Sequence, residues 1–253
     1  MELNYKAIGE GKPIIILHGV FGSLDNWLTV GKKLSESFKI YLLDLRNHGD
    51  SFHDEEFTYE AMSDDLVNFI KHEKIDNPVI IGHSMGGKVA MKFGVNHPEL
   101  FDRLIIVDIA PRAYPPHHQN ILKGLNSIDL KALKSRKEAE EQLASYVPEI
   151  GERQFLLKNL KREGENFMWK LNLPVITEKI NNVGEGLEDK LATDKPTLFI
   201  RGENSDYITN KDNISIVAFF PNSEVKTVKN AGHWVHAQNP EAVIELVTEF
   251  VHN

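Results

Sequence analysis

Short runs of apolar residues alternate with amphipathic stretches along most of this chain. The runs are too short for helices and rich in β-branched residues, which is typical of strands buried on both faces of a parallel sheet. The predicted strands cover residues 14–17, 40–43, 79–81, 104–107, 197–200 and 225–228. Apolar residues at helical spacing predict helices over 27–34, 62–72, 85–93 and 240–251. Strands that alternate with helices predict right-handed crossovers, and so an α/β fold with a mainly parallel central sheet flanked by helices.

The pattern changes between residues 112 and 191, where no strongly apolar strand follows Pro115 and Pro116. We expect this segment to form a helical cap over the carboxyl edge of the sheet, and residues 1–111 with 192–253 to form the core domain. Charged helical patterns or extended pieces in the cap are expected over 130–134, 139–146, 155–160, 168–171 and 175–183.

Three large side chains of the predicted cap are candidates for contact with a substrate. Phe155, Met168 and Trp169 either line a substrate cavity or only attach the cap to the core, and the sequence leaves both possibilities open.

The turn after residues 79–81 holds a serine with glycines two positions before and two after it, in Gly82-His83-Ser84-Met85-Gly86. A turn this tight strains the central residue and leaves no room for side chains at the flanking positions, so glycine fits there. This is the Gly-x-Ser-x-Gly pattern of a nucleophile elbow. We therefore predict that Ser84 is a nucleophile at the carboxyl end of its strand.

Glycines also follow the first predicted strand, in His18-Gly19-Val20-Phe21-Gly22. They allow the backbone to approach a ligand closely. The N–H groups of Val20 and Met85 are the candidate donors of an oxyanion hole, because Met85 begins the helix behind the serine. Phe21 is a candidate substrate contact. A plain strand-to-helix turn, capped by Ser23 or Asp25, is compatible with the same residues.

A serine hydroxyl needs a histidine base, and the histidine needs a carboxylate. Of the 11 histidines, His233 is the candidate because it follows a glycine directly after the last strand. Two acids compete for the third role. We favour Asp206 from its place in the chain order, while Asp108 stays open because it sits directly at a strand end.

Arg46 and His48 are expected to hold their loop by hydrogen bonds rather than to act in catalysis.

The composition of the chain argues against several classes of function. The chain has 253 residues, a net charge of -8 and no cysteine. Its acidic balance argues against a nucleic-acid partner, and the missing thiols exclude disulfides and thiolate-bound metals. The N-terminal residues do not resemble a signal peptide, and no run approaches the length of a membrane helix. We expect a cytoplasmic protein that acts on a small molecule without contacting a membrane; the oligomeric state is not predicted.

Several motifs together resemble the α/β-hydrolase superfamily, and within it the bacterial YbfF-type carboxylesterases. They are Gly82-His83-Ser84-Met85-Gly86-Gly87, His18-Gly19-Val20-Phe21-Gly22-Ser23, Asp44-Leu45-Arg46-Asn47-His48-Gly49, Asp108-Ile109-Ala110-Pro111 and Gly232-His233-Trp234-Val235-His236. The resemblance implies an α/β-hydrolase fold and hydrolysis of short-chain esters through an acyl-enzyme on Ser84, with no metal or organic cofactor. It also strengthens Asp108, because relatives of this subgroup can lack an acid where Asp206 stands. A lyase or synthase that uses the serine and histidine for proton transfer, and a non-catalytic ligand-binding member, are the alternatives.

Overall fold

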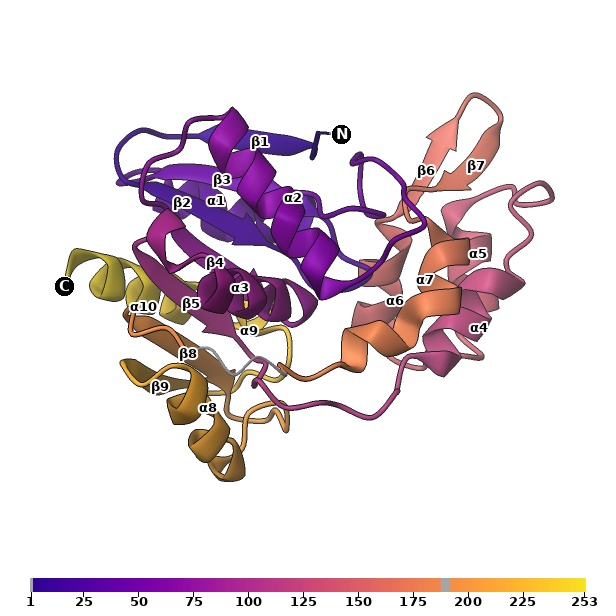
Figure 1. Cartoon of the computed structure of the whole chain (residues 1–253). Coiled ribbons are helices and arrows are strands. Elements are labelled where there is room, and N and C mark those ends of the chain that lie inside the picture. Colours follow the sequence, from indigo (N-terminus) through magenta and orange to yellow (C-terminus); the bar gives the residue numbers. More distant parts are fainter. Residues whose placement is uncertain (1, 188–191) are drawn as a thin grey trace.

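The computed structural model describes residues 2–187 and 192–253, and its centre is a twisted sheet (Figure 1). In this described part of the chain, the main sheet has seven strands in the order β1-β3-β2-β4-β5-β8-β9. Only β1 among these strands runs antiparallel to its neighbour. The bounds are β1 Tyr5–Ile8, β2 Pro13–Leu17, β3 Lys39–Leu43, β4 Val79–His83, β5 Arg103–Val107, β8 Thr197–Gly202 and β9 Ser223–Val228. The mainly parallel sheet predicted from the apolar runs is confirmed.

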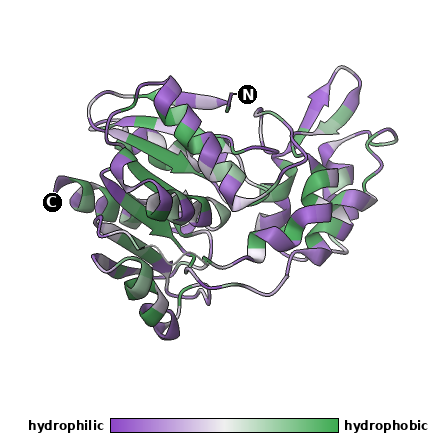
Figure 2. Cartoon of the chain, in the orientation of Figure 1, coloured by the Kyte–Doolittle hydropathy of each residue, from purple (hydrophilic) through white to green (hydrophobic). Residues whose placement is uncertain are grey.

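Helices cover both faces of the sheet, and the strand residues alternate between the two layers. Ile15 and Leu17 pack in the cluster that includes α2 and α3, whereas Ile14 and Ile16 pack in the cluster that includes α1 and α10. Figure 2 shows the central strands as the most continuously hydrophobic part of the molecule. The helices of this layer structure are α1 Leu28–Leu34, α2 Tyr59–His72, α3 Met85–Asn96, α8 Asn213–Phe219, α9 Val235–Gln238 and α10 Pro240–His252.

Short 3-10 helices complete the core. They are η1 Leu24–Trp27, η2 Pro98–Leu100 and η4 Asn210–Asp212. In the described part of the chain, no helix is both long enough and apolar enough to cross a bilayer.

A group of smaller elements lies between β5 and β8 and packs to one side of the sheet (Figure 1). We propose that it is the cap domain of the sequence analysis. Residue 1 and residues 188–191, which belong to the expected domain ranges, lie outside the described residues. The elements are α4 Gln119–Ser127, α5 Arg136–Leu143, α6 Ile150–Leu157, β6 Leu160–Glu163, β7 Asn166–Trp169, α7 Leu173–Lys179 and η3 Ile180–Gly184.

The first helix of this group was placed wrongly by the sequence pattern. A helix was expected over 130–134, but α4 ends at Ser127 and the expected stretch is a turn. The side chain of Asp129 accepts hydrogen bonds from the backbone N–H groups of Lys131 (3.0 Å) and Ala132 (3.4 Å). An Asp side chain that bonds the backbone two residues onward stabilises a turn in place of a helix.

Lys88 on the core helix α3 makes hydrogen bonds to both ends of the inserted group. Its side chain is almost fully buried on α3, and its Nζ donates to the carbonyl oxygens of Pro111 (3.0 Å), Arg112 (2.5 Å) and Glu185 (2.9 Å). Pro111 and Arg112 lie where the chain leaves β5, and Glu185 lies where it returns toward β8. One ammonium group therefore satisfies carbonyls of both connections.

Lys88→Met is expected to lower the free energy of unfolding by about 2–4 kcal/mol, because three carbonyls, those of Pro111, Arg112 and Glu185, lose their charged donor. Urea unfolding measures the change, and limited proteolysis reports whether cleavage after Arg112 is faster. Lys92→Met is the matched control one turn along α3, where the lysine pairs with the exposed Glu60. Equal stability of the Lys88→Met variant and the wild type would contradict the role given to this ammonium group.

Candidate active site

Ser84 occupies the sharp turn between β4 and α3 that the glycine pattern predicts. Its backbone has φ +52° and ψ −115°, a strained conformation for a residue with a side chain. A Cβ at Gly82 would lie 2.2 Å from the carbonyl oxygen of Gly86, and a Cβ at Gly86 would lie 2.5 Å from that of His18. Both flanking positions therefore require glycine, and the turn presents Ser84 at the carboxyl end of β4.

His233 connects Ser84 with a buried carboxylate. Its Nε2 lies 3.0 Å from Ser84 Oγ, and its Nδ1 lies 2.9 Å from Asp108 Oδ2. Asp108 is fully buried and also accepts hydrogen bonds from the N–H of Gly202 (2.9 Å to Oδ1) and from Ser205 Oγ. A carboxylate at Nδ1 keeps the proton on that nitrogen and leaves Nε2 free to accept the serine proton.

The preference for Asp206 as the acid is corrected by this geometry. The side chain of Asp206 is exposed. Its backbone carbonyl accepts a hydrogen bond from Arg112 Nη2 at 3.3 Å. Asp108 instead leaves β5 with φ +52°, and its side chain reaches His233. Ser205, one residue before Asp206, takes the place beside the imidazole and donates to Asp108.

The two candidate oxyanion donors come from the residue after Ser84 and from a loop that passes against it. Met85 is the first residue of α3, and Val20 belongs to the loop after β2. A Cβ at Gly19 would lie 3.3 Å from Ser84 Cβ, so this loop passes directly against the serine. Neither N–H donates to a residue of the described part of the chain. Two free N–H groups beside a nucleophile are suited to bind the oxygen of a tetrahedral intermediate.

The loop after β2 is held from both sides. The backbone N–H of Phe21, which has φ +59°, donates to His48 Nε2 at 3.3 Å. From the inserted group, the buried Asn159 donates its Nδ2 proton to Phe21 O at 2.6 Å. His18 accepts from the N–H of Leu45 at Nε2 (3.0 Å). These bonds fix the backbone that carries the N–H of Val20.

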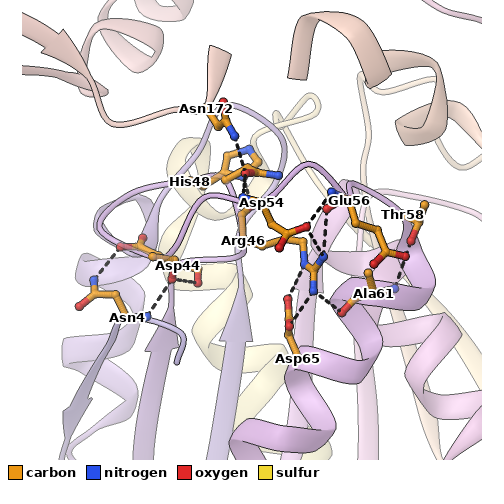
Figure 3. Close-up of polar contacts among 12 residues, drawn as sticks. Asn4, Asp44, Arg46, His48, Asp54, Glu56, Thr58, Ala61, Asp65 and Asn172 are labelled. Carbon is orange, nitrogen blue, oxygen red and sulfur yellow. Dashed lines mark hydrogen bonds and ion pairs between the residues drawn. The ribbon is translucent and has the colours of Figure 1, made fainter. Parts of the chain in front are cut away.

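The loop after β3 has the structural role expected for Arg46 and His48 (Figure 3). Arg46 binds both carboxylate oxygens of Asp65, with Nε 2.6 Å and Nη2 2.8 Å away. His48 Nδ1 donates to the carbonyl of Arg46 (2.9 Å), which leaves Nε2 as the acceptor for the neighbouring loop. Asp44 accepts from the N–H groups of Leu24 (2.8 Å) and Asp50 (2.9 Å). The loop therefore supports the site through hydrogen bonds.

The inserted group is bonded to the same loop. Asn172, at the start of α7, donates Nδ2 to Asn47 Oδ1 at 2.9 Å (Figure 3), and its N–H donates to Asn47 O at 3.0 Å.

Four histidines around the site, His18, His48, His83 and His236, are buried, and burial lowers their pKa values. His83 Nε2 donates to the carbonyl of His233 at 2.8 Å and so holds the loop of the base. Burial lowers the pKa of His18 to about 4 and that of His48 to about 3. Burial also lowers the pKa of His236 to about 3, and it depresses the pKa of His83 well below its usual range. Sequence reasoning missed the role of His83, although it directly precedes the nucleophile.

These four histidines predict a steep loss of stability in acid. Below pH 6.5 the unfolded chain takes up four protons that the folded protein binds only at lower pH, near pH 4 for His18 and near pH 3 for His48 and His236. Stability therefore falls as the pH is lowered from about 6.5. The expected slope from these groups is about 5 kcal/mol per pH unit. Thermal unfolding at a series of pH values tests it.

His236→Phe is the matched variant for the acid prediction. It removes one of the four histidines, keeps a flat ring against Trp27 (4.2 Å, 7° between planes), and removes an Nδ1 that has no hydrogen-bond partner. The slope is expected to fall by about 1.4 kcal/mol per pH unit. A slope that does not change would show that His236 is not buried in its neutral form.

A cavity of about 140 Å³ opens on Ser84 and His233. Phe21 and Phe155 line it, and their contact with a substrate stays a prediction. Met168 and Trp169 are not among its lining residues, so this cavity does not support the first of the two possibilities left open for them. They lie on β7 of a hairpin, where alternation turns Trp169 into the core of the inserted group and leaves Met168 40% exposed.

Sequence reasoning also missed a stack of flat groups that ends on the base. The ring of Tyr207 lies parallel to His233, with centroids 3.8 Å apart and 16° between planes. Tyr114 also stacks on Tyr207 (5.3 Å, 30°), and the guanidinium of Arg112 lies 3.9 Å from the Tyr114 ring centroid. The hydroxyl of Tyr207 also donates to His117 Nε2 (2.6 Å). The other ring nitrogen of His117, Nδ1, donates to a backbone carbonyl. The stack fixes the plane of the imidazole.

Metal chemistry has no obvious ligand set here. Among the residues that the structure describes, no group of three or more His, Cys, Asp or Glu side chains is arranged to hold a metal ion.

Comparison with known proteins gives consistent matches over nearly the whole chain. A family model described as alpha/beta hydrolase fold matches residues 12–240. The chain is 36% identical over 246 residues to the sn-1-specific diacylglycerol lipase ABHD11 of Mus musculus, covering 94% of this chain and 80% of that protein. It is 36% identical over 259 residues to esterase YbfF of Escherichia coli K12, covering 100% of both. A solved structure described as a marine microorganism esterase has 43% identity and a TM-score of 0.96, covering 98% of this chain and 99% of that one.

Proposed function

The chain belongs to the α/β-hydrolase family, and on this basis we propose that it is a serine carboxylesterase that cleaves short-chain acyl esters through an acyl-enzyme on Ser84. Hydrolase activity of the esterase and lipase kind is supported by its relatives. The arrangement that supports this assignment most strongly is the bond path from Ser84 Oγ to His233 Nε2 (3.0 Å) and from His233 Nδ1 to Asp108 (2.9 Å).

In the first half of the reaction, Ser84 Oγ attacks the ester carbonyl carbon while its proton passes to His233 Nε2. The carbonyl oxygen becomes an oxyanion that accepts hydrogen bonds from the N–H groups of Val20 and Met85. The Asp108 carboxylate stabilises the imidazolium that forms. The tetrahedral intermediate collapses as His233 protonates the alcohol oxygen, the carbon–oxygen bond breaks, and an acyl group stays on Ser84.

In the second half, water attacks the acyl carbon and gives its proton to His233 Nε2. The same N–H donors hold the second oxyanion. His233 then returns the proton to Ser84 Oγ as the carboxylic acid leaves, so the serine, the histidine and the carboxylate end the cycle unchanged.

The preference for short acyl chains rests on the size of the cavity. Its volume of about 140 Å³ is below the 300–1,000 Å³ usual for sites that enclose drug-sized ligands. Phe21, Phe155 and Trp234 contribute apolar walls. A small-molecule ester as the substrate and a cytoplasmic location are parts of the same proposal.

The experiment is a panel of p-nitrophenyl esters from acetate to decanoate, with kcat/KM measured for each. We expect acetate and butyrate to be the best substrates and decanoate to be at least about ten-fold worse. A preference for decanoate would overturn the short-chain assignment. A lyase or synthase of the same fold would give little turnover of any ester, and a binding protein would not react with a fluorophosphonate at Ser84.

A further inference from the structure

The cavity at Ser84 carries one formal charge apart from its histidines. Among its described lining residues, Glu152 is the single carboxylate, and none is a lysine or an arginine. Glu152 lies in the first turn of α6, a helix of the inserted group, and is half-buried. Its negative charge therefore faces the space where a substrate has to lie.

No cation of the described chain neutralises this carboxylate. The neighbouring Arg153 is committed elsewhere, since its Nη1 donates to the carbonyls of Val147 (2.9 Å) and Pro148 (2.6 Å) and its Nη2 lies 3.8 Å from Glu140. Glu152 itself makes no salt bridge or side-chain hydrogen bond to a described residue. Lys158, at the other end of α6, lines a neighbouring groove rather than this cavity.

The groups around Glu152 leave its negative charge uncompensated and offer surfaces that attract cations. Burial, followed by repulsion from Glu149, raises the pKa of Glu152. Aromatic rings also line the cavity. The ring centroids of Phe155 and Trp234 lie 5.6 Å apart, and burial together with nearby charges, among them that of Glu152, raises the pKa of Tyr207. A carboxylate among aromatic faces is suited to an alkylammonium group, because the rings attract cations as well.

We propose that Glu152 and the aromatic walls form a cation-binding subsite, so that the enzyme favours esters carrying an ammonium group over isosteric neutral esters and disfavours anionic ones. This inference rests on the esterase function proposed above. Hydroxyl and ammonium donors find an acceptor in Glu152, whereas a carboxylate or phosphate on the substrate meets a like charge.

A structural role is the alternative. Glu152 lies near the N-terminus of α6, where a negative charge stabilises the helix dipole. Glu149 provides the matched control, because it lies at the N-cap of the same helix but does not line the cavity. Glu149→Gln removes the same charge from the same helix end and leaves the proposed subsite intact.

The experiment compares acetylcholine with 3,3-dimethylbutyl acetate, its neutral isostere, and with acetoxyacetate as the anionic ester, at pH 8. For the wild type we expect kcat/KM to be about ten-fold higher for the cationic ester than for the neutral one. Glu152→Gln should bring this ratio close to one, and Glu152→Lys should reverse it. Glu149→Gln should keep the wild-type ratio, and added salt should reduce it.

Binding is measured separately in Ser84→Ala, by tryptophan fluorescence, with acetylcholine and its neutral isostere. Tighter binding of the cation that is lost in Ser84→Ala with Glu152→Gln supports the subsite even if turnover is slow. Equal binding and equal kcat/KM of the two esters in the wild type would overturn it, as would a ratio that survives Glu152→Gln. A wild type that hydrolyses none of the esters but still binds the cation selectively would contradict the esterase proposal and support the cation-binding subsite.

Discussion

Ser84→Ala is expected to lower kcat on p-nitrophenyl acetate by a factor of about 10⁴ or more, while the protein stays folded. The variant removes the oxygen that forms the acyl bond, and neither His233 nor the oxyanion donors can replace it. Steady-state kinetics measure the loss, and labelling by a fluorophosphonate should disappear with it. Thermal unfolding checks the fold.

Ser63→Ala is the control for this loss. Ser63 is buried on α2, and its Oγ has no hydrogen-bond partner. Removing this second buried hydroxyl is expected to leave kcat and the labelling unchanged. A Ser84→Ala protein that still turned over the ester at wild-type rates would end the acyl-enzyme mechanism, whatever its stability.

Asp108→Asn is expected to lower kcat by a factor of about 10³–10⁴, whereas Asp206→Asn should change it by less than about two-fold. An amide at position 108 does not stabilise the imidazolium, and its NH₂ group can favour the wrong tautomer of His233. Asp206 is exposed, and its side chain makes no recorded hydrogen bond in the described structure. kcat on the acetate ester, measured for both variants, separates the two acids.

The pair of variants is matched because each replaces one carboxylate by an amide of the same shape. A large loss in Asp206→Asn with normal activity in Asp108→Asn would show that the loop after β8 rearranges and brings Asp206 to the imidazole. Comparable losses in both variants would show that the exposed carboxylate contributes to the site through its charge.

The core of the fold was predictable because its strands are buried on both faces. Each of β2, β4 and β5 carries a short unbroken apolar run, which is typical of a strand buried on both faces of a parallel sheet. The edge strand β1, residues Tyr5–Ile8, was missed because most of its side chains are exposed and leave no apolar signal. The helix α8 was missed because some of its apolar residues face solvent, so its apolar positions do not mark one buried face. Ile214 and Val217 are 83% and 56% exposed.

The close approach of Ser84 and His233 was predictable, but the position of the carboxylate beside them was not. Glycine spacing marks Ser84 because the backbone is crowded at Gly82 and Gly86, whereas His233 was selected by its place directly after the last strand. The direction of a side chain at a strand end leaves no such trace. Asp108 faces the imidazole because its backbone turns through a positive φ, and no residue pattern around it reports that turn.

The parallel stack of Tyr207 on His233 also gives the imidazole a spectroscopic signature. A proton above the face of an aromatic ring is shielded by the ring current, so the carbon-bound protons of His233 should resonate upfield of those of the exposed histidines in a nuclear magnetic resonance spectrum. His233, one of 11 histidines, would then report its own protonation by a resolved line.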